Sequence, residues 1–441
     1  MLIWLVLIPL IAAALIGLCK APARPTALLS ASLTLALGIW ALVSFDGCSS
    51  CWSRFEGMDL QLTLAPALSK VMLLLTILVT FATVLGTNPP QGGEASWYNS
   101  ALLISAGATG AFLSDNIISF FAFHELALIP TFVMIGTQAG FTFSGLKDFM
   151  ASGRELAHAE LIGALLIAGF GTLISLFPFH SWAAPAYASA PAPVAMMHAG
   201  VLKKFGLYGL FMFQPLMETG FLPWTNILLV LLVCNVIWVG YVTVNQKRLD
   251  LLLGNSSVMH MGYIFLAFAA LVVSGSAEAN PWALKGAALL MLAHGLTIAL
   301  LFLLCGQIEK QTGTLEINSL GGLSTRLPRM AFVFGLAGMA SIGLPGLANF
   351  PGEFMVFFSG FAGFSNGFGP VQIATILCLW GLVIGAVYML RAYRNIFQGD
   401  LSKASAYATG LQPSERAANY FLVIALAVFG FFPTLVLQFF S

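Results

Sequence analysis

The chain consists largely of apolar runs that are long enough to cross a lipid bilayer. A helix needs about 17 to 25 apolar residues to span the hydrocarbon layer, and such runs recur from Leu2 to the end of the 441-residue sequence. Apolar residues make up 59% of the chain and charged residues 8%, a balance that excludes a water-soluble protein. We therefore predict an all-α, polytopic membrane protein with thirteen spans, near residues 2–18, 26–44, 66–86, 99–114, 117–138, 161–177, 192–213, 222–244, 249–272, 283–305, 330–364 (broken), 371–390 and 417–438.

The segments between these spans carry no sign of a second domain or of a cofactor site. The longest polar loops, at 45–65, 139–160, 306–329 and 391–416, are too short to bury a core of their own, so residues 1–441 form one integral membrane domain. The net charge of +1 argues against nucleic acid as a partner. No cleaved signal peptide is predicted. There is also no glycine-rich nucleotide loop, iron–sulfur cysteine cluster or His-x-x-x-His pair, so any redox chemistry belongs to other chains.

Two of the six cysteines form a C-x-x-C pattern in the loop after the second span. Cys48 and Cys51 have no second pair to complete a metal site, so we expect a loop disulfide or no bond.

The positively charged loops fall into two groups. Short loops rich in lysine and arginine face the cytoplasm. With thirteen crossings the two groups face opposite sides: the first holds Lys20, Arg24, Lys147 and Arg154, and the second Lys247, Arg248, Lys310, Arg326, Arg329, Arg391, Arg394 and Lys403. One more crossing between about 139 and 192 would unite them, but 139–160 holds five charged residues and is a poor lipid-facing helix. Both topologies stay open, and we expect an unusual element there.

Two of the apolar runs are interrupted at membrane depth. The stretch 161–213 contains Pro178, Pro185, Pro191 and Pro193, and a second interruption runs from Gly343 to Glu353. Broken backbone within a bilayer survives only where protein or a water-filled cavity surrounds it. Paired discontinuous helices in the two halves of a chain indicate an inverted-repeat transporter, although proline and glycine also produce simple kinks.

Ionisable residues within the apolar runs mark a candidate ion path. Glu125 lies inside the predicted span 117–138, where a carboxylate is costly unless it is functional or paired, and we favour a proton carrier over a structural ion pair. Lys203 and Lys204 are adjacent within 192–213, so on a helix they point about 100° apart. One of them is expected to line the path, and the other to pair, to snorkel or to face a neighbouring chain.

Three further residues extend this candidate path. His260 and His294 lie in successive predicted spans and are either relay members or satisfied packing residues, because imidazole can accept on one nitrogen while it donates from the other. Glu353 follows the second break, where a carboxylate can meet water. His180 and His198 lie near the first break and are expected at an interface.

Taken in order, these motifs resemble one known family. The chain is similar to the antiporter-like subunits of respiratory complex I, which are related to subunits of Mrp-type cation/proton antiporters and membrane-bound hydrogenases. The resemblance extends from about Trp97 to Arg394 and rests on His124-Glu125-Leu126, Phe177-Pro178-Phe179-His180-Ser181-Trp182, Ala199-Gly200-Val201-Leu202-Lys203-Lys204-Phe205-Gly206, Ser256-Ser257-Val258-Met259-His260-Met261-Gly262, Ala293-His294-Gly295-Leu296 and Gly343-Leu344-Pro345-Gly346 with Pro351-Gly352-Glu353-Phe354.

The resemblance implies a fourteen-helix fold with two inverted repeats, here 99–213 and 222–364, flanked by helices in 1–98 and 365–441. It implies a proton-translocating subunit of a complex I-type NADH:quinone oxidoreductase in a bacterial inner membrane, moving protons or Na⁺ beside other membrane-arm subunits. NADH, FMN, iron–sulfur clusters and quinone would sit on partner subunits. The family's proton-carrying positions fall on Glu125, Lys204, His260, His294 and Glu353, with Lys203 as an additional candidate.

Three departures from the family affect this expectation. The family's lysine before the first break falls on Leu173, which carries no proton, and the segment 138–161 is too short for the family's sixth helix with its loop. Asp250 stands where a basic residue usually begins a helix. Our hypothesis is that the first half-channel is modified or silent, and the alternatives are an Mrp or hydrogenase subunit or a structural spacer that does not pump.

Overall fold

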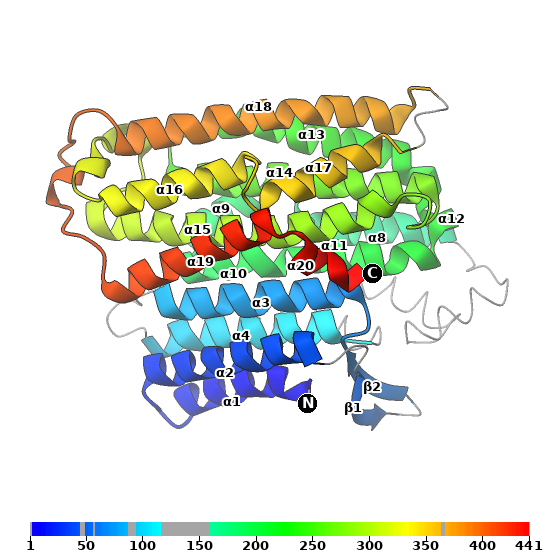
Figure 1. Ribbon diagram of the computed structural model, residues 1–441, viewed down its shortest axis with the longest axis horizontal. Coiled ribbons are helices and arrows are strands. Elements are labelled where there is room, and N and C mark those ends of the chain that lie inside the picture. Colours follow the sequence, from blue (N-terminus) through cyan, green and yellow to red (C-terminus); the bar gives the residue numbers. More distant parts are fainter. Residues whose placement is uncertain are drawn as a thin grey trace.

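The computed structural model describes residues 2–44, 49–55, 58–86, 94–115, 159–362 and 367–440. In this part of the chain, long helices lie side by side along one common direction, which is horizontal in Figure 1. Seven of the described helices are long and apolar enough to cross a membrane, and three shorter helices are also apolar. The predicted all-helical, polytopic membrane fold is confirmed.

Four N-terminal helices form one edge of the bundle (Figure 1). The second and third are joined by a two-stranded antiparallel hairpin, located where the sequence predicted only a polar loop. Cys48 of the C-x-x-C pattern, and with it that prediction, lies outside the described residues. The elements are α1 (Ile3–Gly17), α2 (Ala23–Ser44), β1 (Ser49–Phe55), β2 (Met58–Thr63), α3 (Ala67–Gly86) and α4 (Glu94–Leu113).

The first predicted break is present and is followed by a second helix segment that the sequence did not indicate. After α8 (Ala159–Ile174) the chain leaves the helix over residues 175–182 and re-enters it as α9 (Ala183–Ser189). The next span is composite, because a π-helical segment interrupts it just before the two lysines. It consists of α10 (Ala192–Met197), η2 (His198–Leu202) and α11 (Lys204–Phe213), followed by the short η3 (Gln214–Leu216), α12 (Glu218–Phe221) and η4 (Leu222–Trp224).

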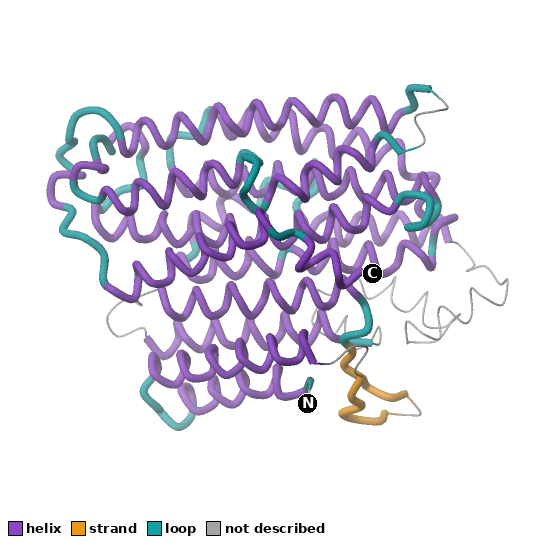
Figure 2. The backbone as a smooth tube through the Cα atoms, in the orientation of Figure 1, coloured by secondary structure: helices purple, strands orange, loops and turns teal. Residues whose placement is uncertain are grey.

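The second half contains the longest helices and the second break. Figure 2 shows this break as a loop part-way along the bundle, at residues 342–348 between α16 and α17. The elements are α13 (Thr225–Val244), α14 (Leu249–Ser274), α15 (Pro281–Thr312), η5 (Ile317–Ser319), η6 (Leu323–Thr325), α16 (Pro328–Ser341), α17 (Asn349–Gly360), α18 (Pro370–Phe397), η8 (Ser405–Tyr407), α19 (Pro413–Phe431), α20 (Thr434–Leu437) and η9 (Gln438–Phe440).

Proline and glycine set several of these boundaries. Pro281, Pro328, Pro370 and Pro413 each occupy the first position of a helix, where the missing N–H costs no hydrogen bond. Gly313 ends α15 in the left-handed conformation, which glycine adopts without steric cost. Each predicted span in the described part of the chain corresponds to an observed helix or pair of helices. The predicted span 117–138 lies outside the described residues.

The helices that carry the predicted histidines are the most enclosed. In the apolar windows of α15 and α14, 100% and 94% of the residues are buried, whereas in those of α2, α18 and α19 only 33%, 39% and 28% are buried. Groups on α14 and α15 are therefore shielded from lipid by the rest of the chain.

The described positive loops of both groups lie at one end of the bundle, on the left in Figure 1. Arg24 Nη2 donates to Ser414 Oγ over 3.0 Å, which joins the start of α2 to the start of α19. Arg391 Nη2 donates to the carbonyl of Gln246. The thirteen-crossing topology, which put Arg24 opposite the later loops, is therefore wrong. Lys147 and Arg154 lie outside the described residues. We call this end, with loops 18–22, 245–248, 313–327 and 398–412, the positive end.

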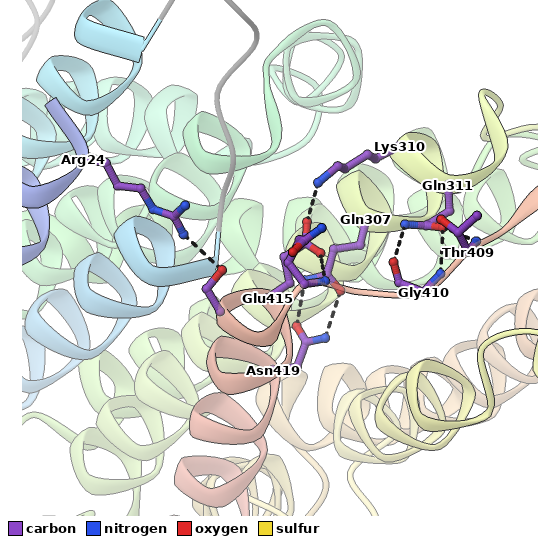
Figure 3. A network of polar contacts seen from close by, with 10 residues as sticks. Arg24, Gln307, Lys310, Gln311, Thr409, Gly410, Glu415 and Asn419 are labelled. Atoms are coloured by element: carbon purple, nitrogen blue, oxygen red, sulfur yellow. Dashed lines mark hydrogen bonds and ion pairs between the residues drawn. The ribbon is translucent and has the colours of Figure 1, made fainter.

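A polar network fastens α19 to α15 near the positive end (Figure 3). Lys310 Nζ donates to Glu415 Oε1 over 2.8 Å, and Glu415 is 2% exposed. One turn earlier in α15 and one turn later in α19, the side-chain amides of Gln307 and Asn419 exchange two hydrogen bonds of 3.1 and 2.9 Å. These contacts fix the rotation of α19 about its own axis relative to α15.

The two broken helices run in opposite directions. Trp224 directly precedes α13, whose last residues lead into loop 245–248 at the positive end. Trp224 Nε1 donates to the carbonyl of Glu160, so the start of α8 lies at the opposite end of the bundle. The break then leads to α9, which packs against α14 near Gly254, close to the positive end. The α16–α17 pair starts at the positive end instead (Figure 1). The division into repeats at 99–213 and 222–364 stays a prediction.

Candidate functional site

Lys204 lies at the centre of the bundle, at the point where a π-helical segment passes into α11. Its side chain is 0% exposed, and Nζ donates to the carbonyl of Ala199 over 2.5 Å. The same Nζ lies 3.1 Å from Nδ1 of His294 on α15. A π-helical turn is common at functional sites because it releases backbone groups from the regular ladder, and here a carbonyl five residues back binds the lysine.

The ring of His294 lies next to the ring of His260 on the neighbouring helix α14. The two ring centres are 5.3 Å apart, and both residues are buried. His260 Nδ1 lies 2.8 Å from the carbonyl of Ser256 and Nε2 lies 2.9 Å from the carbonyl of Ser341. Carbonyl oxygens only accept, and a neutral imidazole has a single N–H. Both contacts are hydrogen bonds only when His260 carries two protons.

The second break supplies one of these carbonyls. Ser341 is the last residue of α16, and the final carbonyls of a helix have no partner within it. The break therefore positions a free acceptor against His260, which links the imidazole to the discontinuous helix.

Glu353 lies on α17, just beyond the same break, and is 3% exposed. Its Oε1 atom has no hydrogen-bond partner among the described residues. Its Oε2 atom lies against Gly343, which has φ of +79° and no space for a Cβ. Asn349 is one turn earlier on α17, and its Oδ1 atom accepts from Thr297 on α15 over 3.0 Å. Thr297 is three residues after His294 on α15, so Asn349 and Thr297 place polar side chains between Glu353 and the turn of α15 that carries His294.

We call Lys204, His294, His260 and Glu353 the central row. The structure brings the first three into a contiguous set of contacts, while Glu353 approaches from α17 beside Asn349. Glu125 lies outside the described residues, and its role stays a prediction.

Several polar residues beside the central row were missed by the sequence analysis. Ser256 and Tyr263 share one face of α14 with the predicted His260 at helical spacing, a signal that could have identified them. Ser256 Oγ lies 2.7 Å from the hydroxyl of Tyr388 on α18, and no sequence pattern connects Tyr388 with α14. The Tyr263 ring lies edge-on to His260, with centres 5.7 Å apart.

Asn235 on α13 is a second omission and holds the first break in place. It is 0% exposed, and its amide nitrogen donates to the carbonyls of Ser175 and Val258 over 3.0 and 3.2 Å. Its Oδ1 atom accepts from the backbone N–H of Phe177 over 2.5 Å. A single amide therefore satisfies the broken backbone at both sides of residue 176.

Lys203 does not join the central row. It is 0% exposed and faces α9, where its Nζ lies 5.7 Å from the centre of the Tyr187 ring. The expected divergence of the adjacent lysines is thus observed. Leu173 is partly buried against the apolar core.

Asp250, the third departure, is paired at the start of α14. It accepts from Arg248 over 3.1 and 2.5 Å and also from the backbone N–H of Leu251. The hydrogen bond and the charge of Asp250 raise the pKa of Arg248 above its ordinary value. Asp250 is thereby held by neighbours on its own segment.

The central row combines groups that both bind and release protons. The ammonium of Lys204 and the imidazoles of His294 and His260 lie in direct succession within the enclosed helices. The carboxylate of Glu353 lies on α17 one turn from Asn349, which is hydrogen-bonded to Thr297 on α15. Such ionisable groups inside a membrane bundle mark ion paths. Among the described residues, no group of three His, Cys, Asp or Glu side chains could hold a metal ion.

Comparisons with known proteins found relatives in both sequence and fold. Residues 122–379 match the family described as NADH:quinone oxidoreductase/Mrp antiporter, TM. The chain is 28% identical to NADH-quinone oxidoreductase subunit M from Rickettsia felis, over 94% of this chain and 90% of the relative. It is 30% identical to NAD(P)H-quinone oxidoreductase chain 4 1 from Synechococcus elongatus, over 88% and 77%.

Solved structures share the fold. A chain of respiratory complex I from Thermus thermophilus with bound NADH superposes with a TM-score of 0.85 at 24% identity, covering 100% of this chain and 97% of that one. A chain of the Mrp complex from Dietzia sp. DQ12-45-1b gives a TM-score of 0.79 at 20% identity, over 99% and 95%.

Proposed function

Because the chain belongs to the NADH:quinone oxidoreductase/Mrp antiporter family, we propose that it is a proton-translocating, antiporter-like membrane subunit of a complex I-type NADH:quinone oxidoreductase. Its role is to couple electron transfer in other subunits to proton movement across the membrane. The observation that carries the proposal is the buried contact from Lys204 to His294 and on to His260, set between two broken helices.

Protons move along the central row by exchange between neighbours. Charged Lys204 donates toward Nδ1 of His294 when that nitrogen carries no proton. Transfer leaves a neutral amine and an imidazolium. Two charged imidazoles with ring centres 5.3 Å apart repel by about 3 kcal/mol at an effective dielectric constant of about 20. Protonation of one histidine therefore drives charge off the other, toward the second break.

Glu353 is the acceptor at that end. A buried carboxylate whose Oε1 atom has no hydrogen-bond partner in the described part of the chain can take up a proton, and the helix break beside it gives access to water. Conformational change driven by the partner subunits alters these contacts and so gives the transfer a direction.

The first half of the chain contributes differently. Glu125 is proposed as the carrier there, with Leu173 in the position where the family has a lysine. Leu173 packs among apolar side chains, which supports a first half that is modified, while the second half retains its titratable groups.

The setting of the subunit follows from the same proposal. It assembles with other membrane-arm subunits in a bacterial inner membrane, and NADH, FMN, iron–sulfur clusters and quinone bind to partner subunits. The positive end, with Arg24 and the later basic loops, faces the cytoplasm.

The test measures protons translocated per electron by the assembled complex in liposomes. Lys204→Ala and Glu353→Ala are each expected to abolish most proton movement. Lys285→Ala removes a charge from the first turns of α15, away from the central row, and is expected to pump normally. An unchanged stoichiometry in the first two variants would refute their role.

An Mrp-type cation/proton antiporter subunit is the second candidate, and the likeness to the Dietzia Mrp chain favours it; a membrane-bound hydrogenase is its near relative. Leu173 supports a third reading, a spacer that links pumping neighbours. Purification of the native assembly separates the first two, because flavin and iron–sulfur subunits indicate respiration, nickel-site subunits a hydrogenase and small antiporter subunits an Mrp complex. The number of protons translocated per electron by the Lys204→Ala and Glu353→Ala variants separates a pumping subunit from a spacer.

A further inference from the structure

A polar cavity lies at the positive end, between the starts of α16 and α19. Its volume is about 480 Å³, and its two walls are the turn that leads into α16 and the segment that leads into α19. Arg326 and Arg329 line it from the first wall and Arg416 from the second. No aspartate or glutamate of the described chain lines it, so the cavity carries three positive charges. We call it the arginine cavity.

The three guanidinium groups lack the protein partners that would neutralise them. None of them forms an ion pair within the described part of the chain. Arg416 Nε is buried, and no described group accepts a hydrogen bond from it. Burial of an unpaired charged donor is costly, and buried polar atoms in folded proteins almost always have a partner. The arginine cavity therefore calls for an anion that can accept from Arg416.

The carboxylate nearest in sequence is engaged on another side of α19. Glu415 accepts from Lys310 Nζ over 2.8 Å and from the backbone N–H of Gln412 over 2.7 Å, and Figure 3 shows it pointing toward Lys310. Successive residues of a helix point about 100° apart, so Arg416 leaves α19 in a different direction. Glu415 is thus not the anion that the cavity requires.

Both walls of the arginine cavity are held in place by the fold. Gln311 on α15 fixes the wall before α19 (Figure 3): its Oε1 atom accepts from the backbone N–H groups of Thr409 and Gly410 over 2.9 and 3.3 Å, and its Nε2 atom donates to the Gly410 carbonyl over 2.8 Å. In the other wall, Pro328 begins α16 and restricts the backbone there. The site is therefore formed before a ligand binds, which lowers the entropic cost of binding.

The helix surfaces beyond the arginines are apolar and exposed. Phe332 follows Arg329 by one turn of α16, and Tyr420 follows Arg416 by one turn of α19; both side chains are exposed, as is Ile424 one turn later. Both helices run from the positive end into the bundle (Figure 1). A ligand that matches this surface has an anionic head and apolar tails. The planar fork of arginine suits phosphate oxygens in particular.

We propose that the arginine cavity binds the headgroup phosphate of an anionic phospholipid, whose acyl chains lie along Phe332 and Tyr420. Basic pockets between membrane helices favour such headgroups, because cationic side chains near the membrane surface attract anionic lipid. The bound lipid joins the start of α16, the first part of the second broken helix, to α19. This inference does not depend on proton translocation and adds a ligand that the proposed function does not include.

The first experiment measures lipid binding at this site in the assembled complex. The complex is freed of native lipid in detergent and titrated with phosphatidylglycerol that carries a diazirine in one acyl chain. The yield of cross-links to peptides containing Phe332 or Tyr420 gives an affinity for this site alone. Diazirine-labelled phosphatidylcholine, which has no net charge, is expected to bind at least about ten-fold more weakly, because three arginines each attract anionic lipid. Equal affinities would overturn the proposal.

The second experiment removes the charges. Arg329→Gln and Arg416→Gln are each expected to weaken phosphatidylglycerol binding by about five-fold, which corresponds to about 1 kcal/mol per arginine, and the double variant by about 25-fold. Arg394→Gln is the matched control, because it removes the same charge from the last turn of α18 and does not line the cavity; it is expected to bind as the wild type does. An equal loss in the control, or none in the double variant, would overturn the proposal. If the double variant fails to assemble, the wild-type ratio of the two lipids decides.

Two other occupants give different results. Inorganic phosphate in excess should leave the cross-links of the wild type in place, because the acyl chains add to the affinity of the lipid; complete displacement would assign the cavity to free phosphate and overturn the proposal. A double variant that keeps its cross-links but loses a partner subunit on a native gel would assign the arginines to an acidic protein segment, which also overturns it. Cross-links that resist phosphate in the wild type and disappear in an intact double variant support the lipid.

Discussion

The contact between Lys204 and His294 depends on a close approach of two glycines. Gly200 in the π-helical segment faces Gly295 on α15. A Cβ added at Gly295 would lie 2.5 Å from Leu75 Cδ1, the end of a side chain that can move, and 2.8 Å from the Gly200 carbonyl oxygen, which is backbone. An ordinary contact begins at 3.4 Å, so Gly295→Ala must separate the helices by about 0.6 Å. That shift lengthens the 3.1 Å contact of Lys204 and His294 to about 3.7 Å, beyond hydrogen-bonding range.

The variant is expected to retain assembly and lose most proton translocation. Overpacking costs about 1–3 kcal/mol, and alanine regains about 1 kcal/mol of helix propensity, so the net loss of stability is small. The assay compares protons per electron and thermal unfolding of the complex. Gly385→Ala on α18 is the matched control, because its added Cβ meets no atom closer than 3.8 Å. Full pumping by Gly295→Ala would show that the close approach is not needed.

Three further predictions concern the scaffold and its orientation. Asn235→Leu leaves the backbone of the first break without its partners and should destabilise the subunit by about 2–4 kcal/mol in thermal unfolding; an unchanged melting point would exclude the anchoring role. Lys310→Met leaves Glu415 buried without its ion pair, and we expect a loss of about 1–2 kcal/mol, limited because Lys310 is half-exposed; Glu415→Gln with Lys310→Met should recover part of it. Cys19 is exposed beside the positive end, so a membrane-impermeant maleimide should label it in inverted vesicles and not in right-side-out vesicles, in a background carrying Cys48→Ser and Cys51→Ser. The reverse labelling would invert the orientation.

The sequence analysis located spans and breaks well because both depend on local composition. Apolar length located every described span, although α15 and α18 extend to Thr312 and Phe397, beyond the predicted ends at 305 and 390, and proline clusters predicted both interruptions. The number of crossings stayed open in the sequence analysis, because the charged residues of 139–160 gave no clear local signal either way. One long-range contact, from Arg24 to Ser414, corrected the side on which the first positive loop lies.

The amino-acid sequence by itself determined that this chain resides in a bilayer, where its helices are interrupted and which ionisable residues lie at depth, since hydrocarbon penalises charge and broken backbone wherever they occur. Only the tertiary structure decided that Lys204 faces His294 and Lys203 faces Tyr187, and that one amide from α13 satisfies the first break. The reason is that spacing along a helix fixes a direction around its axis, whereas the neighbour met in that direction is set by the packing of helices that are distant in the chain.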